Sequence, residues 1–163
     1  MKACIYGAGA IGGWMGMALA QAGCQLSLVA RGATLAALQA EGLRLRRPDG
    51  SVAQTAVTAH ADPAALGVQD LVVLAVKAPG LPDVARAIAP LLGQDTIVLT
   101  AMNGVPWWFL DGFGGAAEGH ALQSVDAGGV IASAIENERH WTRATRPFCR
   151  TRRSIAAFSC IST

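Results

Sequence analysis

Three glycines with the spacing GxGxxG lie near the start of the chain, at Gly7, Gly9 and Gly12. A short apolar run, residues 3–6, precedes them, and small and apolar residues follow over 11–22. Such a turn between a strand and a helix is typical of domains that bind dinucleotides, because each glycine has its own task. The first permits a tight turn, the second lets the backbone approach a pyrophosphate, and the third lets helix and strand pack closely. The sequence therefore predicts the start of a Rossmann-type domain.

The beginning of the helix after this turn is the expected phosphate site. Free N–H groups and a partial positive charge at a helix N-terminus attract anions. We therefore expect the pyrophosphate of a dinucleotide to be held by Gly7, Ala8, Gly9, Ala10, Ile11 and Gly12. A glycine-rich turn in an unrelated α/β protein is the alternative interpretation.

The end of the expected second strand, residues 25–30, indicates which dinucleotide is bound. Domains that prefer NAD(H) usually place Asp or Glu there, about 20 residues beyond the glycines, to accept hydrogen bonds from ribose hydroxyls. This chain has no acidic residue before Glu41, and Arg31 followed by Gly32 occupies the position. A guanidinium pairs well with the 2′-phosphate of NADP(H). We therefore predict an NADP(H) site, with a solvated loop arginine as the alternative.

The pattern beyond the second strand predicts an α/β domain with three layers and a mostly parallel sheet. Two continuously apolar runs have the composition of strands that are covered on both faces. Apolar residues at helical spacing lie between these runs. The expected elements are a helix ending at Gly23, a short helix from the N-cap Thr34 to Gly42, strands at 71–76 and 96–101, and a helix over 81–92. Residues 105–135 are expected to form loops and helical turns.

A turn sequence separates two further runs of strand-forming residues. Pro48-Asp49-Gly50 lies between residues 43–47 and 51–58. Proline, aspartate and glycine in this order favour a reversal of the chain. We expect either a β-hairpin or an additional antiparallel edge of the main sheet.

Lys77 and Asn103 follow two successive expected strands. In open parallel sheets ligands bind in the crevice outside the carboxyl ends of the strands, so we expect both side chains near the site. An ammonium group can contact a phosphate or a carboxylate, and an amide can orient a carbonyl or a hydroxyl. A solvated lysine and a turn-forming Asn-Gly pair are the alternatives.

The composition fits one globular domain followed by a different tail. The chain has 163 residues, of which 52% are hydrophobic and 15% charged, as expected for a single domain with a buried core. Residues 1–138 contain seven Lys or Arg and eleven Asp or Glu, whereas 139–163 contain six Arg and no acid. We expect the domain to end at residue 138. The tail lacks hydrophobic periodicity, and no nucleic-acid-binding fold surrounds its arginines, so we expect no nucleic-acid partner.

The cysteines, histidines and aromatic residues show no further catalytic or metal-binding pattern. They are Cys4, Cys24, Cys149 and Cys160, His60, His120 and His140, and the run Trp107, Trp108 and Phe109. Zinc and disulfide spacings are missing, so we expect no metal and a reducing cytoplasm. The aromatic run either packs in the core or lines a pocket. No apolar run approaches the roughly 18 residues of a membrane span, although a secretory signal peptide over 2–20 is an alternative interpretation.

Taken in order, four segments resemble the ketopantoate reductase family, whose members are also called 2-dehydropantoate 2-reductases. The segments are Gly7-Ala8-Gly9-Ala10-Ile11-Gly12, Arg31, Val76-Lys77-Ala78-Pro79 and Asn103-Gly104-Val105-Pro106-Trp107-Trp108. The resemblance covers residues 1–138. It extends to Glu118-Gly119 and Ser124-Val125-Asp126-Ala127-Gly128-Gly129, with alanine at 127 where the family is expected to have proline.

The resemblance implies reduction of 2-dehydropantoate to (R)-pantoate by NADPH, a step of pantothenate biosynthesis. It implies that residues 7–12 hold the pyrophosphate, that Arg31 holds the 2′-phosphate, and that Lys77 and Asn103 lie near cofactor and substrate. It also implies that the proton-donating lysine lies in a helical second domain, which would follow residue 163. We therefore expect a truncated chain that is inactive alone, and translation in a shifted reading frame after about Glu138.

Two other functions remain open from the sequence. One is a different NADP-dependent 2-oxoacid or opine-type dehydrogenase, which would share the glycine turn and differ in its second domain. The other is a non-catalytic nucleotide-sensing domain, which would usually carry an acid where Arg31 stands. Comparing the binding of NADPH with that of NADH separates the sensor from the reductases.

Overall fold

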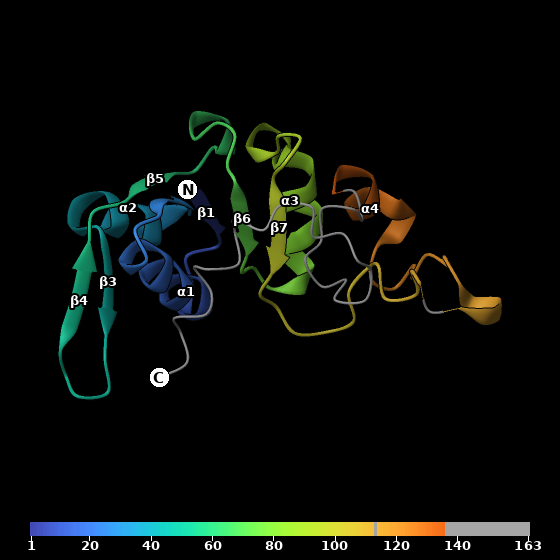
Figure 1. The fold of residues 1–163 in the computed structure, drawn as a ribbon, viewed down its shortest axis with the longest axis horizontal. Coiled ribbons are helices and arrows are strands. Elements are labelled where there is room, and N and C mark those ends of the chain that lie inside the picture. The colour runs from blue at the N-terminus through green and yellow to red at the C-terminus, as the bar shows by residue number, and fades with distance from the viewer. Residues whose placement is uncertain (113, 136–163) are drawn as a thin grey trace.

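A parallel five-stranded sheet forms the centre of the computed structural model (Figure 1), which describes residues 1–112 and 114–135. In spatial order its strands are β5 (Thr58–His60), β2 (Gln25–Val29), β1 (Lys2–Tyr6), β6 (Leu71–Leu74) and β7 (Ile97–Thr100). All neighbouring pairs run parallel. The chain passes from β1 to β2 on one side and later to β6 on the other, so the strand order reverses at β1. Ligands of doubly wound sheets bind at such a switch point, outside the carboxyl ends of the strands.

Helices cover both faces of this sheet and complete the three layers. Figure 1 shows α1 on one side of β1 and β6, with α3 and α4 on the other. The α-helices are α1 (Ala10–Gln21), α2 (Gly32–Glu41), α3 (Leu81–Ala87) and α4 (Val130–Ala134). Short 3-10 turns are η1 (Pro63–Ala65), η2 (Ala78–Gly80), η3 (Ala89–Leu91), η4 (Gly115–Ala117) and η5 (Ala127–Gly129). The predicted Rossmann-type α/β architecture with a mostly parallel sheet is confirmed.

The side chains of β1 alternate between the two helical layers. Ala3 and Ile5 are fully buried on the α1 side. Cys4 and Tyr6 are buried on the opposite side, in the same cluster as Val84 of α3. Because both faces of the strand are covered, its interior residues are apolar without alternation. The ring of Tyr6, the last residue of the strand, therefore lies on the α3 side, directly before the glycine turn.

The expected hairpin forms, but it is shorter than predicted and separate from the main sheet. Its strands, β3 (Leu43–Arg46) and β4 (Val52–Thr55), make a two-stranded antiparallel sheet of their own. The Ser51 N–H donates to the Asp49 carboxylate (2.8 Å) and stabilises the turn. Thr55 pairs with Leu43, the first residue of β3, so the residues that follow Thr55 have no β3 residue to pair with. The chain then runs beside β2 as the separate parallel strand β5, and the predictions of a strand to residue 58 and of an antiparallel edge were wrong.

The N-cap predicted at Thr34 was also wrong. Helix α2 begins at Gly32, and its N-cap is Arg31, whose backbone is extended. The Leu35 N–H donates to the Arg31 carbonyl (3.4 Å), so the hydrogen-bonded turns already start at Arg31. Thr34 lies inside the first turn, which frees its side chain for another contact.

Helix α3 ends earlier than the apolar spacing predicts. It stops at Ala87, and the 3-10 turn η3 replaces the rest of the expected helix. Pro90 has no N–H to donate and disfavours helical backbone at the residue before it. The buried residues Ile88 and Leu91 still pack in the core, so their spacing reflects burial and not a continuous α-helix.

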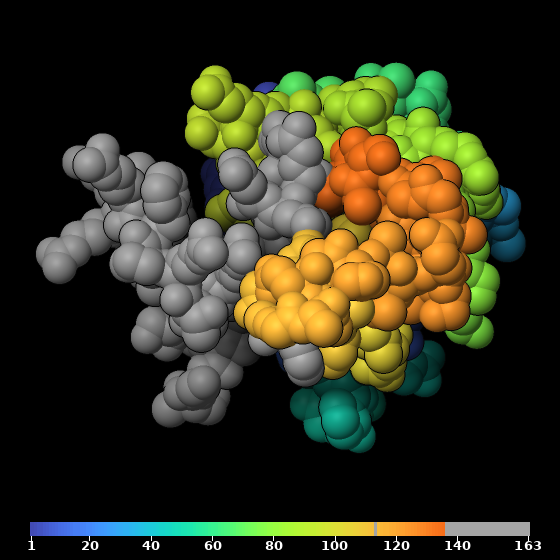
Figure 2. Space-filling view, turned by 90° about the vertical axis from the view of Figure 1, so that its right-hand side faces the viewer, coloured from blue at the N-terminus to red at the C-terminus, as the bar shows by residue number. Residues whose placement is uncertain are grey.

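The segment after β7 consists of loops and short helical turns, as expected. Figure 2 shows its later part and α4 gathered at one end of the molecule, beside α3. The predicted domain boundary at residue 138 and the tail 139–163 lie outside the described residues. Within the ranges that the structure describes, none of the helices has the length and apolar composition needed to cross a membrane.

Asp126 fixes α4 at this end of the molecule. It is 4% exposed, and its carboxylate accepts hydrogen bonds from the N–H groups of Ile131 and Ala132 (both 2.9 Å). We expect Asp126→Ala to lower the free energy of unfolding by about 2 kcal/mol, because buried amide groups lose a charged acceptor. Urea unfolding followed by circular dichroism measures the change. Gln123→Ala, which removes an exposed acceptor from Gly128, is the control and should cost less than about 0.5 kcal/mol. Equal losses in the two variants would contradict the prediction.

Candidate dinucleotide-binding site

The glycine turn lies where β1 ends, at the switch point of the sheet. Gly7 has φ +103°, and its N–H donates to the carbonyl of Val29 at the end of β2 (3.1 Å). A Cβ at this position would approach the carbonyl oxygen of Ala75, just beyond β6, to 2.9 Å. Glycine is required here both for the positive φ and for this close approach. The turn is thus held between the two strands that flank β1.

The other two glycines of the motif meet opposite surroundings. A Cβ on Gly12 would lie 2.1 Å from the Gly7 carbonyl oxygen and 2.9 Å from the Ile5 side chain, so this glycine permits close packing of helix on strand. A Cβ on Gly9 would meet no atom of the described residues within 4 Å. Steric packing within the described chain therefore explains Gly12, whereas Gly9 leaves open space in front of the turn. That space is what a pyrophosphate needs to reach the backbone.

The N-terminus of α1 is available for an anion. Gly9 is its N-cap, no side chain caps the helix, and its first turn contains no acidic residue. Ala10 and Ile11 begin the helix and are exposed, and Ala8 is half-buried beside them. Unpaired N–H groups and the helix dipole favour negative charge at this place. Binding of a pyrophosphate by residues 7–12 stays a prediction that fits this geometry.

A cavity of about 320 Å³ opens beside the turn. Segments far apart in the sequence form its walls: the end of β1, the end of β2, the first turn of α2, and the η2–α3 region. The lining residues are Tyr6, Gly7, Ala8, Gly9, Val29, Ala30, Arg31, Thr34, Val76, Gly80, Asp83 and Val84. Its volume is near the lower end for small-molecule sites, so it suits part of a dinucleotide.

Arg31 supplies the positive charge of this cavity. Among the lining residues of the described chain it is the one basic side chain, and Asp83 is the one acidic side chain. Asp83 is also paired with Arg86, whose Nη1 lies 2.9 Å from its carboxylate, at the exposed surface of α3. Thr34 brings a hydroxyl from the next residues of α2 to the same cavity. An arginine and a hydroxyl at a helix N-terminus suit a phosphate group.

Tyr6 forms part of the cavity wall and is 5% exposed. Burial raises the pKa of its phenol; the nearby Arg31 guanidinium lowers the pKa in part, and Cys4 and Asp83 raise it further. The Tyr6 hydroxyl is nevertheless buried without a hydrogen bond of good geometry in the described part of the chain. Burial also raises the pKa of the neighbouring Cys4 thiol to about 12, which leaves it protonated and without a role as a nucleophile.

Lys77 and Asn103 lie at the same edge of the sheet, as expected from their strands. Each stands three residues beyond a position of the β6–β7 ladder, in which Leu74 pairs with Thr100. Both are exposed, and neither lines the cavity beside the glycine turn. Lys77 directly follows the lining residue Val76. Contact of either side chain with cofactor or substrate stays a prediction.

Several lining residues were missed from the sequence. Residue preferences predict a capping role for Thr34, although its position three residues beyond Arg31 places it near that residue on a helix. The apolar pattern predicts only a strand residue at Tyr6, although it directly precedes the first glycine. No local signal identifies Gly80, Asp83 and Val84, because they reach the cavity through the packing of α3 on the sheet.

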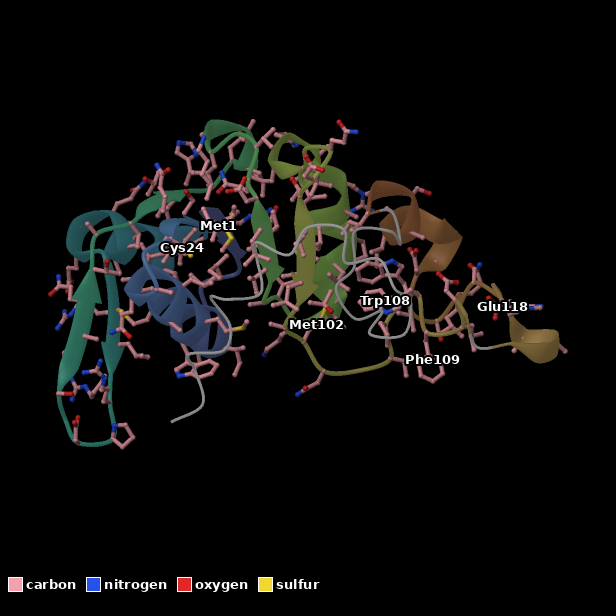
Figure 3. All side chains as sticks on the ribbon, in the orientation of Figure 1. Met1, Cys24, Met102, Trp108, Phe109 and Glu118 are labelled. Atoms are coloured by element: carbon pink, nitrogen blue, oxygen red, sulfur yellow. The ribbon has the colours of Figure 1, made fainter. Side chains whose placement is uncertain are left out.

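Two residues of the aromatic run, Trp107 and Trp108, pack in the core, whereas Phe109 is exposed. Trp107 is 5% exposed, and its ring meets that of Trp108 edge to face, with centroids 4.2 Å apart. Figure 3 shows Trp108 and Phe109 toward the end of the molecule that carries Glu118. None of the three aromatic residues lines the cavity, so packing is the better interpretation for Trp107 and Trp108.

The histidines and a second hollow do not extend the site. His60 accepts a hydrogen bond from the Asp62 N–H (3.2 Å), and His140 lies outside the described residues. No group of three or more His, Cys, Asp or Glu side chains that suits a metal occurs in residues 1–112 and 114–135. The hollow on the α1 side, near the labelled Met1 and Cys24 in Figure 3, has no charged side chain in its lining. Its lining therefore offers no charged side chain to a phosphate.

Comparisons with known proteins identify the family to which this chain is similar. The sequence model of the family described as ketopantoate reductase PanE/ApbA matches residues 3–106. A 2-dehydropantoate 2-reductase of Mesorhizobium japonicum is 52% identical over 140 residues, which are 85% of this chain and 43% of that protein. A crystal structure assigned as a ketopantoate reductase of Ralstonia solanacearum has a TM-score of 0.79 at 54% identity, and covers 85% of this chain and 42% of that one. A PanE/ApbA family ketopantoate reductase of Ralstonia eutropha has a TM-score of 0.60 at 40% identity, with coverages of 64% and 35%.

The chain thus spans less than half the length of these relatives. The matched residues contain the glycine turn, Arg31, Lys77 and Asn103. They also make up more than half of the chain. On this match, the chain belongs to the ketopantoate reductase PanE/ApbA family.

Proposed function

We propose that this chain supplies the NADP(H)-binding half of a 2-dehydropantoate 2-reductase. The observation that carries the proposal is the meeting of Arg31 with the glycine turn in one cavity at the switch point of the sheet. The relative from Mesorhizobium japonicum, which bears this enzyme name, supports the choice of reaction. The reaction reduces the ketone of 2-dehydropantoate to (R)-pantoate, in pantothenate biosynthesis in the cytoplasm.

The described residues have the chemistry to bind and orient the cofactor. Residues 7–12 and the start of α1 hold the pyrophosphate through backbone N–H groups. Arg31 and Thr34 hold the 2′-phosphate at the start of α2, and the apolar side chains of Val76 and Val84 offer a surface to the adenosine. The bound cofactor supplies the hydride of the reaction. The two proposed phosphate-binding sites of the chain are thus built from two successive βα units.

Lys77 and Asn103 are the residues of this chain that we assign to the substrate side. They leave neighbouring strands at the edge where the glycine turn lies. Lys77 would contact a phosphate or the substrate carboxylate, and Asn103 would orient a carbonyl or a ribose hydroxyl. We assign no proton donor for the developing alkoxide among the described residues, so the proposed role of this chain is binding and orientation.

A direct titration tests the proposal. The purified chain is titrated with NADPH and, separately, with NADH, and the dissociation constants are determined by calorimetry. We expect NADPH to bind at least tenfold more tightly, because NADH lacks the phosphate that pairs with Arg31. Equal affinities or tighter binding of NADH would contradict the proposal and favour a nucleotide-sensing domain.

A further inference from the structure

The Tyr6 hydroxyl is the least explained polar group of the described site. It belongs to the single tyrosine of the chain, is buried at the wall of the cavity, and has no hydrogen-bond partner within residues 1–112 and 114–135. Leaving a hydroxyl in this state is unfavourable, since it loses its water without gaining a partner. A phenylalanine ring would fill the same core position without this cost. We therefore expect the hydroxyl to gain a hydrogen-bond partner when a ligand occupies the cavity.

Arg31 is the one basic residue among the described residues that line this cavity. The β1–β2 register pairs Tyr6 with Val29, and Arg31 follows Val29 by two residues. Both side chains line the same cavity, and the guanidinium is close enough to influence the phenol electrostatically. A phenol oxygen can accept one guanidinium N–H while the remaining four stay available.

Asp83 makes the orientation of this guanidinium important. Asp83 lines the same cavity, and its carboxylate could attract Arg31 away from a phosphate. The ion pair with Arg86 reduces this competition from outside the cavity. Within the cavity, a hydrogen bond from Arg31 to Tyr6 would restrict the orientation of the guanidinium.

We propose that Tyr6 is a positioning residue for cofactor selection, whose hydroxyl accepts an N–H of Arg31 and holds the guanidinium where the 2′-phosphate binds. This inference rests on the proposed function, because it requires NADP(H) as the ligand. It adds a residue on β1 to the phosphate site at the start of α2. Pre-orientation of Arg31 reduces the rotamer freedom that is lost on binding. The benefit is confined to ligands with a 2′-phosphate.

A comparison of two ligands on the wild type and three variants tests this inference. Dissociation constants for NADPH and NADH are measured by calorimetry on the full chain, as wild type, Tyr6→Phe, Arg31→Ala and the double variant. We expect Tyr6→Phe to weaken NADPH binding about five- to tenfold, as for the loss of one hydrogen bond, and to change NADH binding less than twofold. In the Arg31→Ala background, the same substitution should have no further effect on NADPH.

The controls separate positioning from a general effect on the core. Tyr6→Phe keeps the ring, and Tyr6→Leu is a second variant without the hydroxyl that should show the same loss of selectivity. Ser27→Ala removes another buried hydroxyl from the adjacent strand, outside the cavity lining, and should leave both affinities within twofold. Circular dichroism checks that each variant is folded.

The outcomes distinguish this inference from the proposed function. Equal weakening of NADPH and NADH by Tyr6→Phe, or an undiminished effect in the Arg31→Ala background, would overturn the role of Tyr6. A Tyr6→Phe variant that keeps the full preference for NADPH over NADH would also overturn the role of Tyr6. The proposed function would still stand in that case if Arg31→Ala removes the preference. If Arg31→Ala leaves the NADPH preference unchanged, the assignment of the 2′-phosphate site fails and the inference fails with it.

Discussion

Replacing Arg31 by alanine should weaken NADPH binding by about 10- to 100-fold and leave NADH binding nearly unchanged. Arg31 is the one basic side chain that lines the cavity in the described chain. Charge-assisted hydrogen bonds contribute about 1.5–3 kcal/mol each, and every 1.4 kcal/mol corresponds to a tenfold change in affinity. NADH carries a hydroxyl where NADPH carries the phosphate, so it has no such interaction to lose. Calorimetric titration of the variant with both dinucleotides measures the two changes.

The matched control for this prediction is Arg47→Ala. Arg47 lies in the turn of the β3–β4 hairpin, where it is exposed and lines none of the cavities described above. Its removal changes the net charge of the chain by the same amount, so a loss of NADPH affinity there would indicate general electrostatic attraction. Similar losses in the two variants, or equal losses of NADPH and NADH in Arg31→Ala, would count against a 2′-phosphate site at Arg31.

Sequence patterns predicted the fold well where local geometry decides it. The three glycines fix a strand, a turn and a helix within a few residues, and continuously apolar segments indicate strands covered on both sides. Pro90 shows the limit of apolar spacing: the residues around it are buried as the pattern predicts, but a proline there does not continue an α-helix. The start of α2 at Gly32, with Arg31 as its N-cap, likewise depends on backbone hydrogen bonds that residue preferences do not reveal.

The site was predictable only in part, because its wall combines separate segments. Gly9 and Arg31 could be found because each follows closely after one of the first two strands. Asp83 and Val84 reach the cavity through the position of α3, which the sequence predicts only as an approximate helix. Tyr6 gives no separate signal, because a strand that is buried on both faces already explains an aromatic residue as part of the core. Its hydroxyl is informative because it has no hydrogen-bond partner among the described residues.

The second large effect is expected from Gly12→Ala, which should destabilise the domain by about 3 kcal/mol or more. The new Cβ would lie 2.1 Å from the Gly7 carbonyl oxygen, a backbone atom, so the conflict cannot be relieved by rotating a side chain. Ile5, which is fully buried in β1, is 2.9 Å away on the same side. Overpacking of a core usually costs about 1–3 kcal/mol, and more when the backbone must move. Urea unfolding followed by circular dichroism measures the loss.

Gly9→Ala is the matched comparison, because the same methyl group is added three residues earlier in the same motif. In the part of the chain that the structure describes, no atom lies within 4 Å of the new Cβ, and the Gly9 backbone is extended with φ −76°, which alanine adopts readily. Its free energy of unfolding should therefore change by less than about 1 kcal/mol. NADPH and NADH binding should both weaken at least tenfold, since the methyl group would stand between the pyrophosphate and the backbone. The two variants thus divide the motif into a packing glycine and a binding glycine, and a Gly9→Ala variant that unfolds like Gly12→Ala, or binds like wild type, would refute that division.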